Sequence, residues 1–354
     1  MTAAEATVGA AEAASDLGYL LAPLHWTAIM RHPRSVAGSA LLFRLCTLVL
    51  AAISLSFFCS EIAVVCRQGT ADLDVFTLTL SVSDTTGTWL VRLVHIAIRE
   101  HDFHRLALQV GQDFAEFLSA DDVPVLLDQG RAARRFTLTY IWFGIAASAY
   151  WLVSPVSPEG LPFILALPYD ATTPLGYAVS WLYCTIVTVH VVVMTMVFDA
   201  FNCVPLVLCV DRNADLLERC LGGMLLGQSL SIGAVACFQM FQVAMSADGL
   251  QQIGKFGCYL FAMLAELFIY CWFGDDLITE SENLALAAYD AVTSLQGCPL
   301  SIKKSLLLMM HRAQRPLRIT AGGFFPLSRE SFVAVVNVSY SFFAILRNFK
   351  DEKV

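Results

Sequence analysis

The chain has 354 residues, of which 57% are apolar and only 15% charged, and its net charge is −8 at pH 7. This balance lies well outside that of an ordinary soluble domain and predicts a membrane protein. The acidic charge, without a basic face of useful size, argues against nucleic acid as a partner. The 11 cysteines are scattered, with no C-x-x-C pair and no histidines at zinc spacing. We therefore expect no metal, no cofactor and no essential disulfide.

Seven segments are candidate membrane spans, since a crossing helix needs roughly twenty apolar residues. In chain order they are residues 39–66, 73–97, 134–153, 174–202, 222–246, 252–274 and 327–347. The N-terminal segment carries acidic residues before any basic one, unlike a cleaved secretory signal, so we expect the first span to act as an uncleaved signal-anchor. The predicted fold class is an all-α membrane protein with seven transmembrane helices.

The placement of basic residues predicts the orientation of these helices. If the N-terminus is inside, only five of the 22 Lys and Arg residues fall outside: Arg67, Lys255, Arg347, Lys350 and Lys353. This bias predicts a cytoplasmic N-terminus and an extracellular C-terminus, opposite to a G-protein-coupled receptor. The chain then divides into a cytoplasmic N-terminal segment (1–38), a ligand-binding bundle of six helices (39–274), a cytoplasmic anchor segment (275–326), and a last helix with a short extracellular tail (327–354).

Three of the ionisable groups inside predicted spans are candidates for function or packing: Asp84, Glu266 and His190. Asp84 sits in an unusually polar helix centre, residues 81–88, and such carboxylates are functional candidates. It would be either the polar floor of a ligand cavity or part of a hydrogen-bond cluster that fixes helix packing. Glu266 is expected to pair with Arg44 or Arg92, and His190 is expected to be a packing residue.

The loop after the third span, residues 154–173, contains no Lys or Arg but four prolines and an apolar patch at 161–167. It could be an extracellular lid or a passive connector. Aromatic side chains, with an alanine and a methionine, gather in the predicted outer halves of the neighbouring spans. They could line an apolar pocket or form the belt that membrane proteins place at the headgroups. These candidates are Phe76, Ala147, Tyr150, Trp151, Tyr177, Trp181, Tyr259 and Met263.

The last span follows a break in the helical pattern at Gly322, Gly323 and Pro326. Its residues Asn337, Ser341 and Ile345 recur every four positions and so share one helix face. Two hydrogen-bonding residues followed by a branched apolar one fit a wet pore wall closing at a hydrophobic gate. They also fit a buried interface between helices.

Enzymatic motifs are missing from the sequence: it has no G-x-S-x-G, P-loop, Rossmann fingerprint or H-E-x-x-H. The carboxylate pair Asp275–Asp276 lies next to a predicted membrane boundary, where we expect it to cap or bond neighbouring helices. We therefore expect no enzyme.

The C-terminal third resembles the insect odorant receptors. The resemblance is carried by T-A-G-G-F-F-P-L-S (320–328), S-F-F-A-I-L-R (341–347), Y-C-W-F-G-D-D (270–276) and R-A-Q-R-P-L (312–317). Ser341-Phe342, five residues and then Asn348-Phe349 echo a motif of the related gustatory receptors. The resemblance is dense from Phe256 to Phe349 and loose before it.

This resemblance implies a ligand-gated non-selective cation channel of four subunits in the plasma membrane of olfactory neuron dendrites. It implies that small volatile hydrophobic ligands bind among the second, third, fourth and sixth helices, where Trp151, Ala147 and Tyr259 are the strongest candidates. Ile345 and Leu346 would form the gate, with Asn337 and Ser341 below it. The chain looks like a tuning, odour-binding subunit that acts with the co-receptor Orco, because it lacks the long second intracellular loop of Orco.

The resemblance also implies that the last helix is split into a cytoplasmic half and a pore-lining half. The cytoplasmic half, the anchor, would run from about Glu280 to Arg318, and its apolar stripe has helix spacing: Leu284, Ala288, Val292 and Leu295. One feature departs from the family. Residues 211–220 run almost directly into Leu221, so the link between the fourth and fifth spans is several turns short, as a natural variant or a shortened gene model. Alternatives are a gustatory-type receptor that needs no co-receptor, a G-protein-coupled receptor and a secondary transporter.

Overall fold

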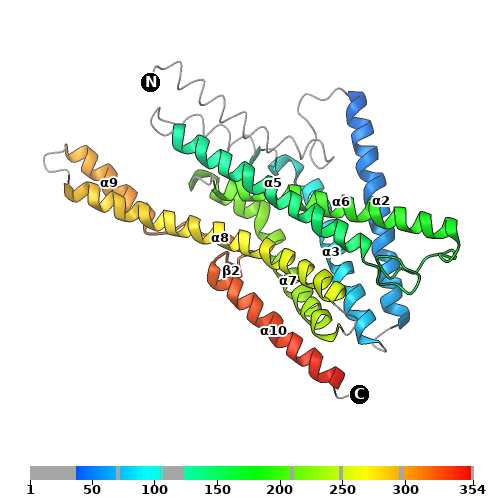
Figure 1. Ribbon diagram of the computed structural model, residues 1–354. Helices are drawn as coiled ribbons and strands as arrows, with labels where there is room; N and C mark the ends of the chain where they lie inside the picture. The colour runs from blue at the N-terminus through cyan, green and yellow to red at the C-terminus, as the bar shows by residue number, and fades with distance from the viewer. Residues whose placement is uncertain are drawn as a thin grey trace.

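The computed structural model describes residues 37–68, 72–103, 105–106, 123–207, 211–246, 250–294 and 299–351. These residues are almost all helical (Figure 1). The helices are α2 (Ala37–Gln68), α3 (Leu73–Ile98), α5 (Val123–Val153), α6 (Pro174–Val207), α7 (Asp211–Met245), α8 (Leu250–Ser294), α9 (Leu300–Ala313) and α10 (Arg329–Asp351). Two short strands, β1 (Thr320–Ala321) and β2 (Phe325–Pro326), pair antiparallel between α9 and α10.

Each predicted span coincides with a helix. In the described part of the chain, five helices are long and apolar enough to cross a membrane: α2, α6, α7, α8 and α10. The apolar part of α5 is shorter, Leu138–Val153. Helix α3 has the length to cross, but its polar centre at residues 81–88 dilutes its apolar character. The all-α membrane fold is therefore confirmed.

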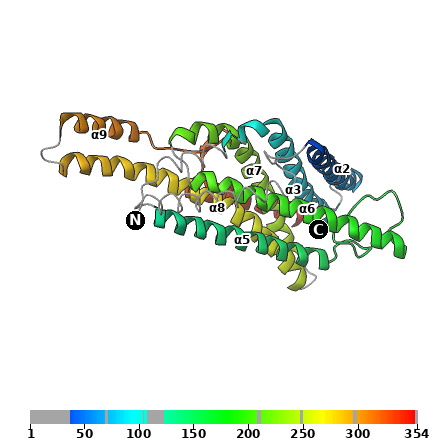
Figure 2. The same cartoon turned by 90° about the horizontal axis from the view of Figure 1, so that it is seen from above.

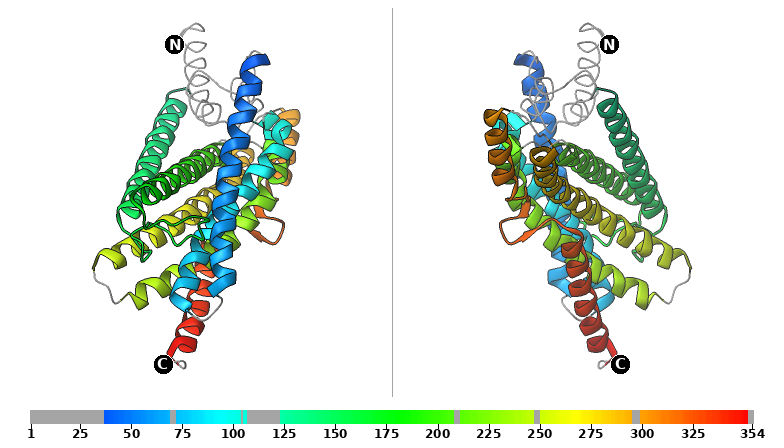
Figure 3. Two further views of the ribbon diagram at one scale, coloured as in Figure 1. Left: turned by 90° about the vertical axis from the view of Figure 1, so that its right-hand side faces the viewer. Right: turned by 90° about the vertical axis from the view of Figure 1, so that its left-hand side faces the viewer.

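Consecutive long helices run antiparallel. The end of α10 therefore lies beside the end of α2 and the start of α3, while α9 projects from the opposite end (Figure 1). Helix α8 is central: it packs against α7 and α10 on one side and against α5 and α6 on the other (Figures 2 and 3). Helix α7 in turn contacts α3, α8, α10 and β1.

Helix α8 continues far past the predicted span of 252–274. Its 45 residues at about 1.5 Å each give a rod of about 68 Å, roughly twice the thickness of a bilayer core. The second half leaves the bundle and packs against α9 (Figure 2). Residues from Glu280 onward, predicted to begin the cytoplasmic half of the split last helix, are instead continuous with the sixth span up to Ser294.

The hairpin formed by β1 and β2 fixes where α10 begins. Gly322 and Gly323 have φ values of +60° and +79°, a left-handed conformation that glycine adopts readily. The Gly322 N–H donates to the Gly222 carbonyl at 2.8 Å, and a Cβ at Gly322 would lie 2.8 Å from Leu226. The Glu218 carboxylate accepts hydrogen bonds from the N–H and hydroxyl of Thr320. Contacts with α7 therefore fix the position of the hairpin that precedes α10.

Candidate ligand-binding site

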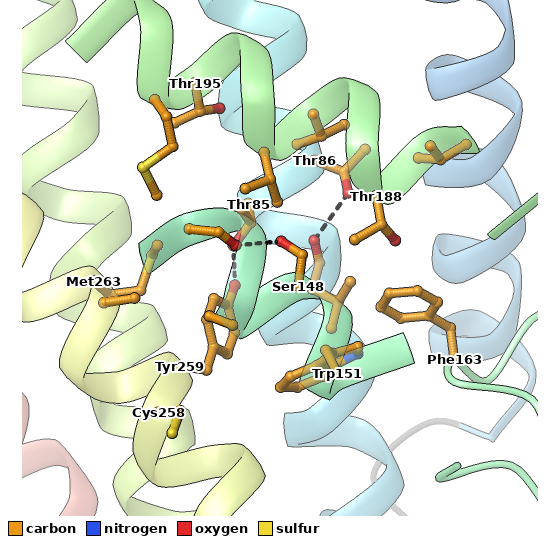
Figure 4. Close-up of a pocket in the computed structure, with 18 of the residues that line it drawn as sticks. Thr85, Thr86, Ser148, Trp151, Phe163, Thr188, Thr195, Cys258, Tyr259 and Met263 are labelled. Atoms are coloured by element: carbon orange, nitrogen blue, oxygen red, sulfur yellow. Dashed lines mark hydrogen bonds between the residues drawn. The ribbon is translucent and has the colours of Figure 1, made fainter. Parts of the chain in front are cut away.

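A cavity of about 120 Å³ lies among α3, α5, α6 and α8, next to the loop that follows α5 (Figure 4). Its walls are mainly apolar, with side chains such as Val82, Val187, Val191, Met196 and Ala262. An apolar cavity of about 150 Å³ is known to bind benzene. This cavity therefore has room for a ligand of about one aromatic ring or a short alkyl chain.

Aromatic rings form one wall of the cavity. Trp151 stacks against Phe163, with ring centroids 6.1 Å apart and planes at 27°. It also meets the edge of Tyr259 at 5.1 Å, and Phe163 meets Phe57 at 5.3 Å. These rings offer shape and dispersion contacts, the main recognition that a small apolar ligand can use.

The loop of residues 154–173 turns inward. Leu161 and Phe163 are buried, and Phe163 is part of the cavity wall. This placement supports the lid interpretation over that of a passive connector. At the far end of the loop, the N–H and hydroxyl of Thr172 donate to Asp170 at 2.9 and 2.7 Å. These bonds lower the pKa of the Asp170 carboxyl and form the turn that leads into α6.

Hydroxyl groups supply most of the polarity of the cavity. The hydroxyls of Thr86, Ser148 and Thr188 donate to backbone carbonyls of their own helices at 2.7–3.1 Å, and Thr85 and Tyr259 bond to each other. A hydroxyl that donates to its own backbone still has lone pairs free. The three donating hydroxyls thus present acceptors to a ligand.

Four of the eight predicted ligand residues line the cavity: Ala147, Trp151, Tyr259 and Met263. The other four lie elsewhere. Phe76 is half-buried near the start of α3, and Tyr150 bonds to the Gln251 carbonyl at 2.9 Å. Tyr177 and Trp181 are exposed near the start of α6, as expected of an aromatic belt.

Sequence reasoning did not identify Phe57, Phe163 and Lys255 as cavity residues. All three line it. Their neighbours in the sequence give no periodic signal for this, because the contact depends on how α2, the loop and α8 meet. Lys255 was assigned only by its basic charge, as an outer residue.

A buried ionic cluster lies next to the cavity. Arg92 is 3% exposed, and its guanidinium donates to Asp199 at 3.2 Å and to Glu266 at 2.9 Å. The Tyr270 hydroxyl donates to Asp199 at 2.9 Å, and the Gln228 amide donates to Glu266. Asp199 and Glu266 each lie three residues beyond a cavity residue. The predicted pairing of Glu266 is therefore with Arg92, and it joins α3, α6, α7 and α8.

Asp84 and His190 lie outside the cavity wall. Asp84 accepts a hydrogen bond from Ser231, whose hydroxyl also lies 2.8 Å from that of Thr88. Both contacts join α3 to α7, so the interhelical interpretation of Asp84 fits the structure. The ring of His190 lies 3.1 Å from the Ser54 hydroxyl and meets Trp89 edge-on, as a packing histidine does.

Helix α10 has one covered and one uncovered face. Phe332 and Val335 pack against a buried cluster that includes Met263 and Leu267 of α8 and Val235 of α7. The predicted stripe of Asn337, Ser341 and Ile345 is exposed, whereas Leu346 is half-buried. The Ser341 hydroxyl donates to the Asn337 carbonyl at 2.9 Å, a bond within the helix.

Charged pairs attach α10 at both ends. Arg329 pairs with Asp275 at 3.1 Å and Asp276 at 2.8 Å, and its guanidinium lies 4.0 Å from the Trp272 ring. The carboxylate pair of α8 thus bonds to a neighbouring helix, as expected. Lys350 pairs with Asp74 of α3 at 2.7 Å.

The sequence is similar to those of known odorant receptors. Residues 206–340 match the family model described as 7tm Odorant receptor. Odorant receptor Or2 of Anopheles gambiae is 24% identical over 306 residues, covering 73% of this chain and 80% of that receptor. Odorant receptor 10 of Aedes albopictus is 37% identical over 119 residues, covering 33% of this chain and 31% of that receptor.

The fold also matches solved structures. The olfactory receptor OR5 of the insect Machilis hrabei, in complex with eugenol, superposes with a TM-score of 0.81 over 94% of this chain and 97% of its own, at 12% identity. The structure described without that ligand gives a TM-score of 0.82. Family model, relatives and fold agree, and they indicate a receptor rather than an enzyme. The chain is thus similar to insect odorant receptors in both sequence and fold.

Proposed function

We propose that this chain is the odour-binding subunit of a ligand-gated, non-selective cation channel. The observation that carries the proposal is the cavity of about 120 Å³ with its aromatic wall of Trp151, Phe163 and Tyr259. A pocket of this kind recognises small volatile apolar molecules by shape and dispersion. Ala147 and Met263 complete the set of sequence-predicted residues that would touch the ligand.

The orientation follows from the charge bias together with the antiparallel helices. The loop that covers the cavity and the C-terminal end of α10 would be extracellular, and α9 would be cytoplasmic. In this orientation the plasma membrane of olfactory neuron dendrites is the expected location. An odorant would then reach the cavity from the side of the loop.

The pore would be lined by α10. Among the five candidate spans of the described residues, α10 is the least covered by the rest of the chain, and Ile345 is 49% exposed. In a tetramer with Orco, Asn337 and Ser341 would face the aqueous route, and Ile345 and Leu346 would close it as a hydrophobic gate.

The contacts between subunits would be made below the membrane by α9 and the second half of α8. These segments expose large apolar side chains, among them Leu286, Leu300 and Leu308 at 64%, 69% and 70%. Such surface is costly to leave in water, which favours association with neighbouring subunits. Of the predicted apolar stripe, Leu284 is exposed, Val292 half-buried and Ala288 buried, and Leu295 lies outside the described residues.

Coupling between cavity and pore would run through α8. Met263 lines the cavity and belongs to the same packed cluster as Phe332 and Val335 of α10. A ligand that fits better when α8 and α10 take their open arrangement shifts the channel toward it.

The first test is co-expression of the chain with Orco, followed by co-purification and recording of odorant-evoked currents. We expect a mixed tetramer and currents from a panel of small volatiles. Trp151→Ala should then raise the half-maximal concentration by at least about tenfold, whereas Trp142→Ala on the same helix, 69% exposed, should not. A folded chain that never joins Orco, or currents unaffected by Trp151→Ala, would contradict the proposal.

A further inference from the structure

Lys255 is a buried cation in the wall of the ligand cavity. It is 1% exposed, although it lies only five residues after the start of α8. Its ammonium donates to the Ser154 carbonyl at 2.5 Å and lies 4.2 Å from the centre of the Trp151 ring. The ammonium is thus fixed beside the aromatic ring that forms the wall of the cavity.

The compensation of this charge is incomplete. Within the described part of the chain, no Asp or Glu forms an ion pair with Lys255, whereas Arg92, Arg329 and Lys350 all pair with carboxylates. An ammonium has three N–H donors, and the structure pairs one of them with Ser154. A buried charge is costly unless a counter-charge and further hydrogen bonds accompany it.

Anchoring the loop does not by itself explain the lysine. The side-chain amide of Gln251 already donates to the Ser154 hydroxyl at 3.3 Å, and that of Gln252 donates to the Pro155 carbonyl at 3.1 Å. Of these three residues of α8, only Lys255 lines the cavity. A loop anchor alone needs no charge at this position.

We propose that Lys255 supplies the counter-charge for an anionic ligand, so that the preferred ligands of this receptor are small apolar carboxylic acids bound as carboxylates. This inference rests on the proposed function of the cavity as the odorant site. The ligand carboxylate accepts hydrogen bonds from the remaining N–H groups of Lys255, and the apolar part of the ligand lies against Trp151 and Phe163. The cavity volume limits that part to about one ring or a short chain.

The test compares acids with primary amides of the same shape, benzoate with benzamide and pentanoate with pentanamide. Binding to the purified complex with Orco is measured by calorimetry, and currents are recorded in parallel. The unmodified receptor should bind each acid at least about tenfold more tightly than its amide. Lys255→Met should remove this preference by weakening the acids alone, and Lys255→Arg should largely keep it.

Gln252→Met is the matched control, because it removes a loop contact without touching the charge. Equal weakening of acid and amide by Lys255→Met would show a loop anchor and overturn the inference. So would amides that bind the unmodified receptor as tightly as acids, a result that needs no variant to fold. Binding of neutral odorants without any preference for acids defeats only this inference. If no small molecule of any class binds in the cavity, the proposed function itself fails.

Discussion

Gly144 sets the width of the cavity where α5 crosses α6. A Cβ at this position would lie 3.0 Å from Met196 Cε and 3.1 Å from its sulfur. We predict that Gly144→Val removes responses to ring-sized ligands while it preserves those to two- or three-carbon ligands, because the added methyl groups and the displaced Met196 both enter the cavity. Dose–response curves for a homologous series measure this shift.

Gly257→Ala is the control for this substitution. Gly257 lies on α8 outside the cavity wall, and no atom lies within 4 Å of its would-be Cβ. It should change neither tuning nor expression. A size series unaffected by Gly144→Val would place the ligand somewhere other than this cavity.

Arg92 holds two carboxylates that have no other cation among the ion pairs of the described residues. We predict that Arg92→Met destabilises the receptor by about 3–5 kcal/mol, since it leaves Asp199 and Glu266 buried without a counter-charge. Thermal unfolding of the purified protein and the amount of it at the cell surface measure the loss. Adding Asp199→Asn and Glu266→Gln to Arg92→Met should recover part of the stability. A triple variant as unstable as the single one would contradict this account.

Individual residues were predicted unevenly from the sequence. A buried carboxylate needs a cation, which pointed from Glu266 to Arg44 or Arg92, and Arg92 is the partner in the structure. Trp151 and Tyr259 were found because the family resemblance implied a ligand site in the outer halves of the third and sixth spans. Phe57 and Phe163 were not found, because only the inward turn of the loop brings them together. Tyr150 was expected in the cavity, but its side chain leaves α5 about 100° from that of Trp151, in the direction of Gln251.

Helix α8 carries the connection from cavity to pore. Met263, 9% exposed, touches the cavity on one side and shares a packed cluster with Phe332 and Val335 on the other. We predict that Met263→Ala lowers the maximal current more than it weakens ligand binding, because the variant loses packing between α8 and α10. Binding and current should be measured on the same preparation. Phe261→Ala, 62% exposed on α8, is the control. Equal losses in binding and current would make Met263 a ligand contact only.

The helices themselves were largely predictable, because an apolar run of this length has few alternatives to a span. Their ends were less so. Gly274 at the predicted membrane boundary does not end α8: a Cβ there would lie 2.5 Å from the Leu327 carbonyl oxygen, so the glycine instead lets the chain before α10 approach the helix. Between α6 and α7, three residues separate the end at Val207 from the start at Asp211. Residues 211–220, the short link noted in the sequence, are therefore the first turns of α7.

On the scale of the whole molecule, the two sides of the bundle have different surroundings. The loop and the aromatic wall close the cavity within one chain. Helix α9 and the second half of α8, which would lie outside the membrane, leave apolar side chains uncovered, as the spans α2, α6 and α10 do inside it. In the proposed orientation, water would surround the uncovered apolar side chains of α9 and α8 in a single chain, and neighbouring subunits would cover them. Ligand recognition would thus be complete in one subunit, and conduction would require the neighbouring ones.

Ile345 allows a test of conduction that needs no ligand. If it closes the pore of the assembled channel, Ile345→Ala should raise the resting cation leak several-fold, since shortening the side chain widens and wets the constriction. The leak is recorded from cells that express the complex with Orco, normalised to surface protein. Tyr340→Ala is the control: it is 60% exposed on the same helix but lies about 140° around the axis from Ile345. Unchanged leak and selectivity in Ile345→Ala would return the stripe of Asn337, Ser341 and Ile345 to a packing role between helices.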